Sequence, residues 1–209
     1  MNRSLGAKAS VMISVQYSTR LSLIFLFLIT LLFNAGAALA MEDYMIDMTQ
    51  PNEYQQWQAT NDNVMGGVSN GQLIYAKPIS RFEGELSLAN NGGFSSINRS
   101  IESLSSDIET VAIIVVGDGR RYQLRFSTRK NGVQINYKHE FSTRDGQLQN
   151  LEFSLKDFQA VYRGRLIDDA PRLAASDISR VGFLIADKTA GPFSLDVGQI
   201  RFKPSMSSQ

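Results

Sequence analysis

The sequence predicts an all-β fold, a β-sandwich or a β-barrel, and three observations support this. Short runs of alternating apolar and polar residues recur along the second two-thirds of the chain. Turn signals rich in glycine, asparagine and aspartate separate the runs, at residues 117–119, 130–132, 144–146 and 190–192. No long window has the 3.6-residue period of an amphipathic helix, and strands do not alternate with helices. Many short strands joined by glycine-rich turns are typical of sandwiches and barrels.

The individual strands follow from these runs. We expect strands over residues 73–75, 82–88, 111–116, 122–126, 133–141, 151–155, 181–186 and 193–202. The runs 111–116 and 181–186 are continuously apolar, which indicates strands buried on both faces or lying in a sandwich core. In the last run the alternation stops at Val197 and resumes one residue out of step at Ile200, which predicts a β-bulge at Gly198-Gln199. Single helical turns are expected at residues 53–57 and 176–179.

Two glycine motifs stand about twenty residues apart, at residues 61–71 (NDNVMGGVSNG) and 88–96 (LANNGGFSS). Each sets a Gly-Gly pair beside Asn or Asp, which predicts tight turns with positive φ or close backbone approach. Neither motif matches a phosphate-binding loop, because position 68 is Val, and Gln72-Leu73 stands where a P-loop has Lys and Ser/Thr. A strand-like segment also follows the first motif, whereas both phosphate loops lead into a helix.

Residues 1–40 have the pattern of a secretory signal peptide. Their charged residues are Arg3, Lys8 and Arg20, an apolar run covers residues 21–33, and small residues lead to Ala38-Leu39-Ala40. Cleavage near Ala40 would leave one domain, residues 41–203, and a frayed tail, residues 204–209, in the periplasm or outside the cell. The alternative is an uncleaved helix that anchors the chain in a membrane, because residues 21–39 are just long enough to span one.

Composition excludes several kinds of site. Without the leader the chain keeps 18 Lys and Arg against 20 Asp and Glu, so it has no electrostatic footprint for nucleic acid. The chain has no cysteine, which excludes disulfides, thiolate metal sites and a cysteine nucleophile. The remaining length of about 170 residues is sufficient for one domain with a sizeable core.

The spacing of chemically active residues predicts no catalytic site, cofactor or metal site. His139 is the single histidine, so a His-rich metal site is excluded, and it is expected to pack on an apolar strand face. Glycoside hydrolysis needs two acids held roughly 5–10 Å apart in a cleft. Asp62, Asp118 and Asp187 lie beside turns, where a turn-forming role is the simpler interpretation.

Two further features have a functional and a structural interpretation. A calcium site from Asp168-Asp169 or from Asp43 and Asp47 is conceivable, but solvated loop acids are favoured. Trp57, the single tryptophan, could form a sugar platform with Tyr54, but packing at the N-terminal edge of the sandwich is favoured.

Ordered motifs from about Trp57 to Phe202 resemble the complex I intermediate-associated protein 30 family. The resemblance rests on Trp57 with both glycine motifs, and on residues 82–88 (FEGELSL), 117–120 (GDGR), 157–158 (DF), 163–165 (RGR), 181–188 (VGFLIADK) and 191–193 (GPF). Two features depart from the family: residues 147–151 lack the Trp that members often carry before the Asp-Phe block, and the leader is an export signal rather than an amphipathic presequence.

The resemblance implies a jelly-roll β-sandwich of the galactose-binding-domain-like kind and a non-catalytic interaction module resembling respiratory complex I assembly factors. The expected partner is a protein bound through the sandwich loops. The alternative is a carbohydrate-binding module of the exported compartment, and an enzyme on polysaccharide ranks third. The residues expected at the binding surface are Trp57, Asp62, Asn63, Asn90, Asn91, Asp118 and Arg120.

Overall fold

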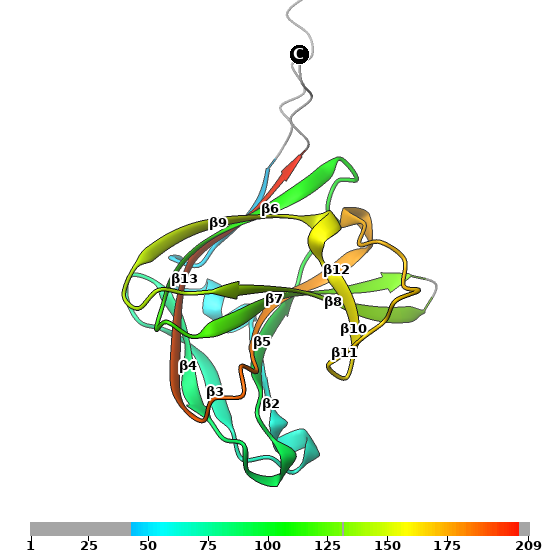
Figure 1. Ribbon diagram of the computed structural model, residues 1–209. Coiled ribbons are helices and arrows are strands. Elements are labelled where there is room, and N and C mark those ends of the chain that lie inside the picture. The colour runs from blue at the N-terminus through cyan, green and yellow to red at the C-terminus, as the bar shows by residue number, and fades with distance from the viewer. Residues whose placement is uncertain (1–42, 131, 205–209) are drawn as a thin grey trace, which may run out of the picture. The chain divides into compact units, whose positions relative to one another are not determined.

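The computed structural model describes residues 43–130 and 132–204. The predicted signal peptide, residues 1–40, and residues 205–209 of the predicted tail lie outside the described residues. The described chain forms two antiparallel sheets of six and seven strands, packed face to face as a jelly-roll β-sandwich (Figure 1). The predicted all-β class is therefore confirmed.

The six-stranded sheet is built around the long C-terminal strand. Its order is β3 (Asn70–Tyr75), β4 (Ser80–Leu86), β13 (Gly191–Pro204), β6 (Ile108–Gly117) and β9 (Leu148–Ser154), and β1 (Tyr44–Asp47) also pairs with β13. The register of β13 against β6 shifts between Val197 and Gln199, so the predicted bulge is confirmed. Because of this shift, both Val197 and Ile200 point into the core.

The seven-stranded sheet carries the strands that border the candidate sites. Its order is β11 (Arg165–Leu166), β10 (Gln159–Tyr162), β8 (Val133–Ser142), β7 (Arg121–Lys130), β12 (Ile178–Ile185), β5 (Ser95–Ser100) and β2 (Gln58–Asn61).

Short 3-10 turns are the helical elements of the described residues. They are η1 (Glu53–Gln56), η2 (Asp62–Met65), η3 (Ala89–Asn91), η4 (Leu155–Asp157) and η5 (Ala175–Asp177). The turn predicted at 176–179 is instead η5, and β12 begins at Ile178 because Ile178 and Val181 are buried core residues. The strand predicted over 82–88 ends at Leu86, since the chain turns there into η3. Within the described residues, no helix has the length and apolar character needed to cross a membrane.

The core lies between the two sheets. Side chains that alternate inward from β6, such as Val111, Ile113 and Val115, are fully buried, while Ile114 on the outer face is half-buried. The continuous apolar run therefore belongs to a sandwich core rather than to a strand buried equally on both faces. Phe126 of β7 and Phe202 of β13 meet across the interface with ring centroids 5.7 Å apart.

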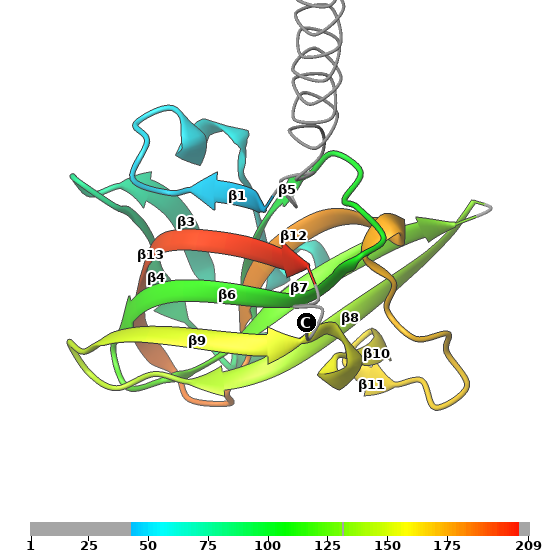
Figure 2. The same cartoon turned by 90° about the horizontal axis from the view of Figure 1, so that it is seen from above.

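The curvature of the sandwich sets its exposed faces. In Figure 1 the six-stranded sheet wraps around the seven-stranded sheet, so the free face of the latter is concave, with β2 and β5 at one margin and β10 and β11 at the other. Figure 2 shows the long hairpin of β7 and β8 running beneath β6 and β13. The turns that follow β2 and β4 lie together at the lower end of Figure 1.

Candidate functional site

One buried carboxylate joins the two glycine motifs. Asp62, 0% exposed, accepts hydrogen bonds from the backbone N–H of Ser69 at 2.8 Å and from its hydroxyl at 2.6 Å. It also accepts from the backbone N–H groups of Gly93 at 2.6 Å and Phe94 at 3.3 Å. The two predicted turns therefore form one structural unit centred on Asp62.

The glycines of both motifs meet the geometric demands of this unit. Gly66 and Gly93 have φ values of +90° and +121°, which L side chains rarely adopt, so the predicted positive φ is confirmed there. A Cβ on Gly67 would lie 2.3 Å from the Asp62 carboxyl carbon, and one on Gly92 would lie 2.5 Å from a carboxylate oxygen. Gly67 and Gly92 thus leave room for the Asp62 carboxylate.

Asparagine side chains add further links between the turns. The Asn61 amide oxygen accepts from the Gly71 N–H at 3.1 Å and from the Ser95 hydroxyl at 2.6 Å. The Asn90 amide nitrogen donates to the Gly66 carbonyl at 3.2 Å. These contacts fix both turns to each other and to the strands that carry them.

The environment keeps Asp62 ionised. Burial by itself would raise the pKa of Asp62, but the hydrogen bonds from the Ser69 hydroxyl and from the backbone N–H groups of Gly93, Ser69 and Phe94 outweigh it, so its pKa lies below the usual value. An anion that accepts four hydrogen bonds inside a protein is a structural anchor rather than a free binding group.

Four apolar side chains project from the turns that Asp62 holds. Val64, Met65, Val68 and Leu88 are 68%, 65%, 58% and 46% exposed, and we call them the apolar turn patch. The Ser69 hydroxyl, which donates to Asp62, accepts a hydrogen bond from the Ser87 N–H at 3.0 Å. Val68 and Leu88 are the chain neighbours of these two bonded serines. Residues 63–71 and 86–96 contain no Lys, Arg, Asp or Glu. The surface is therefore apolar and amide-bearing, without formal charge.

Of the residues predicted at the binding surface, three asparagines lie beside this patch. Asn63, Asn90 and Asn91 are exposed, and Asn90 and Asn91 both have a φ of 55°, a conformation that asparagine tolerates. The sequence patterns did not predict a role for the apolar side chains themselves. The signal that could have found them was the absence of charge from two turn segments that retain Val, Met and Leu.

Asp118 and Arg120 form a separate latch at the β6–β7 turn. The Arg120 guanidinium binds Asp187 in a bidentate pair at 2.9 and 2.7 Å and donates to the carbonyls of Gly191 and Pro192 at 3.1 and 2.7 Å. The hydrogen bond that Arg120 donates to Asp187 raises the pKa of Arg120. Burial alone would raise the pKa of Asp187, but its bonds with Arg120 and the Thr189 N–H lower it. This latch holds the loop between β12 and β13.

Asp118 is engaged in the same region. Its carboxylate accepts from the Tyr122 hydroxyl at 3.1 Å and from the Ser194 N–H at 2.8 Å. The structure therefore brings Asp118, Arg120 and Asp187 together, apart from Asp62, and occupies all of them with protein contacts.

Trp57 packs inside the sandwich edge, as the favoured interpretation expected. It is buried, its ring lies 6.2 Å from that of Phe183, and its indole N–H donates to Glu53 at 3.1 Å. Glu53 also pairs with Arg99. Tyr54 stacks on Tyr75 with centroids 6.4 Å apart rather than forming a platform with Trp57.

The concave face of the seven-stranded sheet carries a polar hollow of about 280 Å³, which we call the sheet groove. Its lining includes hydroxyl, amide and guanidinium groups from the five strands β2, β5, β7, β8 and β12: Thr60, Ser96, Asn98, Arg125, Asn136 and Arg180. Gly182 lies at its floor opposite Arg125 in the β7–β12 register. The residues that line the groove include no aspartate or glutamate.

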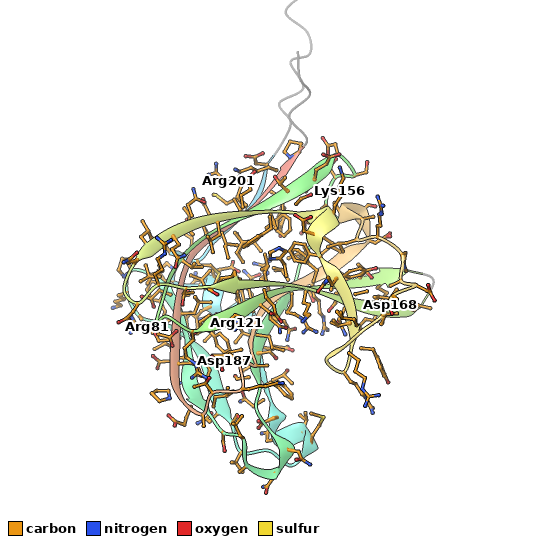
Figure 3. The ribbon with its side chains drawn as sticks, in the orientation of Figure 1. Arg81, Arg121, Lys156, Asp168, Asp187 and Arg201 are labelled. Atoms are coloured by element: carbon orange, nitrogen blue, oxygen red, sulfur yellow. The ribbon has the colours of Figure 1, made fainter. Side chains whose placement is uncertain are left out.

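Two further features lie on the surface outside the groove. A hollow of about 310 Å³ lies between Arg121, Glu140 and Asp187, and Figure 3 shows Arg121 and Asp187 on the same flank of the molecule. Asp168 lies at the opposite margin, on the loop after β11 (Figure 3). Among residues 43–130 and 132–204, no group of three or more His, Asp or Glu side chains is placed to hold a metal ion. Asp47 instead accepts hydrogen bonds from Thr49 and Gln50.

His139 packs against aromatic rings, as its strand face suggested. Its ring lies 4.4 Å from that of Phe153 and 5.4 Å from that of Phe158, and its Nδ1 is buried without a hydrogen-bond partner among the described residues.

Comparison with solved structures supports the fold. The chain is similar to the family 11 carbohydrate-binding module of the Clostridium thermocellum cellulase Lic26A-Cel5E, with 14% identity, a TM-score of 0.61 and coverage of 81% of this chain and 98% of that one. It is also similar to the family 30 module of Clostridium thermocellum Cel9D-Cel44B, with 12% identity, a TM-score of 0.53 and coverage of 79% and 99%. At these identities the likeness concerns the fold.

Comparison of sequences identifies the family. Curated protein sequences gave no match to this chain. The family model described as Complex I intermediate-associated protein 30 matches residues 46–197, which span almost the whole sandwich from β1 into β13. The chain therefore belongs to the Complex I intermediate-associated protein 30 family.

Proposed function

We propose that this chain is a non-catalytic interaction module that binds a protein partner through the apolar turn patch. The observation that carries the proposal is the exposure of Val64, Met65, Val68 and Leu88 on turns that Asp62 fixes in place. Cores of protein interfaces are depleted in charged residues, and the two turn segments contain none.

Rigidity makes such a surface effective. The Asp62 hydrogen bonds order the turns before any partner arrives, so binding would cost little additional conformational entropy. The exposed amides of Asn63 and Asn91 lie beside the apolar side chains and offer donors and acceptors for a polar rim.

The family supports a protein as the occupant, because its name describes association with complex I intermediates. The engagement of the turn acids supports a non-catalytic role. Asp62, Asp118 and Asp187 each accept protein hydrogen bonds, which leaves none of the three as a free general acid or base.

Charge substitution tests this proposal. Val68→Asp and Met65→Asp place a carboxylate in the patch and should abolish co-purification of the partner from native cells, with unchanged melting. Leu148→Asp is the matched control, because Leu148 is an equally exposed apolar residue on β9, at the opposite edge of the six-stranded sheet from β3. Loss of the partner in the Leu148 variant as well, or its retention in both patch variants, would contradict the proposal.

A second candidate function is glycan binding in the sheet groove. The observation that favours it is the lining of hydroxyl, amide and guanidinium groups, which suits the dense hydroxyls of a saccharide. A structure similar to this chain, with 15% identity and a TM-score of 0.59 over 79% of this chain and 98% of that one, is a family 11 module in complex with a mixed-linked tetrasaccharide. The groove lining includes one aromatic residue, Phe183, which is buried, so stacking would contribute little.

Binding assays on the intact sandwich test this second candidate. Soluble polysaccharides of several linkages should retard the protein in affinity gels, and Asn136→Ala should weaken the retardation. If no saccharide retards the protein, the second candidate fails, whereas the apolar turn patch is tested independently.

We also propose that the module works in the periplasm or outside the cell, because residues 1–40 carry the pattern of an export signal. N-terminal sequencing of the protein from native cells should then begin at Met41. A start at Met1 or Met12 would favour an uncleaved anchor instead.

A further inference from the structure

We propose that the sheet groove binds a saccharide that carries carboxylates, a uronic-acid glycan, with the Arg125 guanidinium pairing one carboxylate. The inference rests on the second candidate function and adds to it the chemical class of the ligand. It comes from a cation that the fold places in the groove without a balancing anion.

Arg125 projects from the middle of β7 into the groove. Its register neighbours are Lys138 on β8 and Gly182 on β12. One guanidinium nitrogen donates to the Gln123 amide oxygen at 2.9 Å, and no carboxylate of the described residues lies within ion-pair distance of it. Burial lowers the pKa of Arg125 below its usual value, although the group stays charged at neutral pH.

A half-buried guanidinium normally has a carboxylate partner, and three of the four other partly buried arginines of the described residues follow that rule, whereas Arg201 contacts the Met45 sulfur. Arg120 pairs with Asp187, Arg99 with Glu53, and Arg81 with Asp196. Arg125 departs from this pattern, and it lines the sheet groove. A ligand carboxylate would supply the missing anion, and guanidinium binds carboxylate in a bidentate geometry.

The charges around Arg125 favour an anion. Lys138 is paired with Glu140 at 2.8 Å, which leaves it little free charge. Arg180 also lines the groove and is exposed, and no carboxylate of the described chain pairs with it. The two arginines therefore set a positive potential in a groove whose other polar lining is neutral.

The floor of the groove gives the ligand room to approach. Gly182 has no side chain, and a Cβ there would lie 2.4 Å from the Ile97 carbonyl oxygen and 3.0 Å from the Asn98 Cβ. Asn98 and Ser96 stand on the far side of Gly182 from Arg125. A sugar ring over Gly182 would therefore have amide and hydroxyl partners on one side and guanidinium on the other.

The test compares acidic and neutral glycans on the same protein. The probes are hexagalacturonate and a hexamannuronate, each against cellohexaose and a mixed-linked β-glucan, with dissociation constants from calorimetry at low salt. We expect a uronate to bind, and Arg125→Gln to weaken it at least about tenfold, the loss expected for a hydrogen bond to a charged group. Arg125→Lys should recover part of the affinity, because lysine keeps the positive charge but lacks the bidentate hydrogen-bond geometry of a guanidinium.

Matched variants separate the site from general charge. Arg201→Gln removes an arginine from β13 of the other sheet, which Figure 3 shows at the upper end of the molecule, and should leave binding unchanged. Polyphosphate should bind no more tightly than the uronates do. The inference would be overturned in favour of non-specific attraction if Arg201→Gln lost as much affinity for the uronates as Arg125→Gln. Tighter binding of polyphosphate than of the uronates would overturn it in the same way.

The outcomes also distinguish this inference from the function on which it rests. Binding of a neutral glycan alone, unaffected by Arg125→Gln, would overturn the uronate inference while the groove remained a glycan site. Absence of binding by every saccharide would overturn both. Melting curves of each variant show whether a loss of binding reflects unfolding.

Discussion

The Asp62 carboxylate lies 2.6 Å from the backbone nitrogen of Gly93, although 31 residues separate the two in the chain. The same carboxylate accepts two hydrogen bonds from Ser69, which precedes β3. One side chain thus joins two turns whose flanking strands also pair, β2 with β5 and β3 with β4, and these turns carry the apolar turn patch.

Replacement of this carboxylate should loosen the whole unit. Asp62→Asn turns one acceptor into a donor that faces backbone N–H groups, so the free energy of unfolding should fall by about 3 kcal/mol. Chemical denaturation measures the change. The neighbouring exposed variant Asn63→Ala should stay within about 0.5 kcal/mol of the parent. A loss below about 1 kcal/mol for Asp62→Asn would show that the carboxylate is not the anchor.

The contribution of Asp62 should depend on pH in a defined direction. Because its pKa is lower in the folded protein than in the unfolded chain, its contribution is complete above pH about 4 and is lost as the pH falls through the folded pKa. The stability difference between the parent and Asp62→Asn should therefore be constant from pH 7 to 5 and shrink below pH 4. Asp47, Glu140 and Asp187 also have lowered pKa values, but their contributions cancel in this difference. A difference that grows in acid would contradict the assignment.

The glycines should be intolerant of side chains for two separate reasons. Gly67→Ala places a Cβ against the Asp62 carboxyl carbon and should destabilise the protein by about 2 kcal/mol through overpacking. Gly66→Val and Gly93→Val should cost a similar amount through backbone strain at positive φ. Gly198→Ala serves as the control, since its nearest contact would be an ordinary 3.5 Å. If Gly198→Ala lowered the melting temperature as much as Gly67→Ala, Gly66→Val and Gly93→Val do, this would argue against close packing around Asp62.

The Arg120 latch should be a stability element rather than a binding element. Arg120→Gln leaves Asp187 without its bidentate partner and should lower the free energy of unfolding by about 3 kcal/mol. A double-mutant cycle with Asp187→Asn should show a coupling of at least about 1 kcal/mol. Additive losses would mean that the two residues do not act as a pair.

Periodicity predicted the parts of the fold in which apolar side chains alternate. The strands β6, β7, β8 and β12 were visible because their inward positions carry large apolar residues. The bulge in β13 was visible in the sequence because the apolar alternation shifts by one residue between Val197 and Ile200, and both side chains are buried.

Other strands lack such a pattern. In β5 the inward positions are Ser95, Ile97 and Arg99, and the serine and arginine are held by hydrogen bonds rather than by apolar packing. In β2, Gln58–Asn61 has no large apolar residue and owes its conformation to pairing with β5. Such elements depend on long-range partners, which a local pattern does not contain.

The same limit applies to the sites. The two motifs around Asp62 were predicted as turns from glycine chemistry, and this held at Gly66 and Gly93. That one carboxylate serves both turns depends on tertiary distance and was not predictable from the spacing. Arg125 is one of several polar residues that alternate along β7, and its lack of an anionic partner becomes visible when the sheet is assembled.

Site-specific photo-cross-linking tests the central claim most directly. A photoreactive residue at Val68, and separately at Leu88, should capture the same protein partner in native cells, because both positions lie on the turns that Asp62 joins. The same residue at Leu148, on the far sheet edge, should not capture it. Capture from Leu148 alone, or capture of unrelated proteins from Val68 and Leu88, would contradict the account.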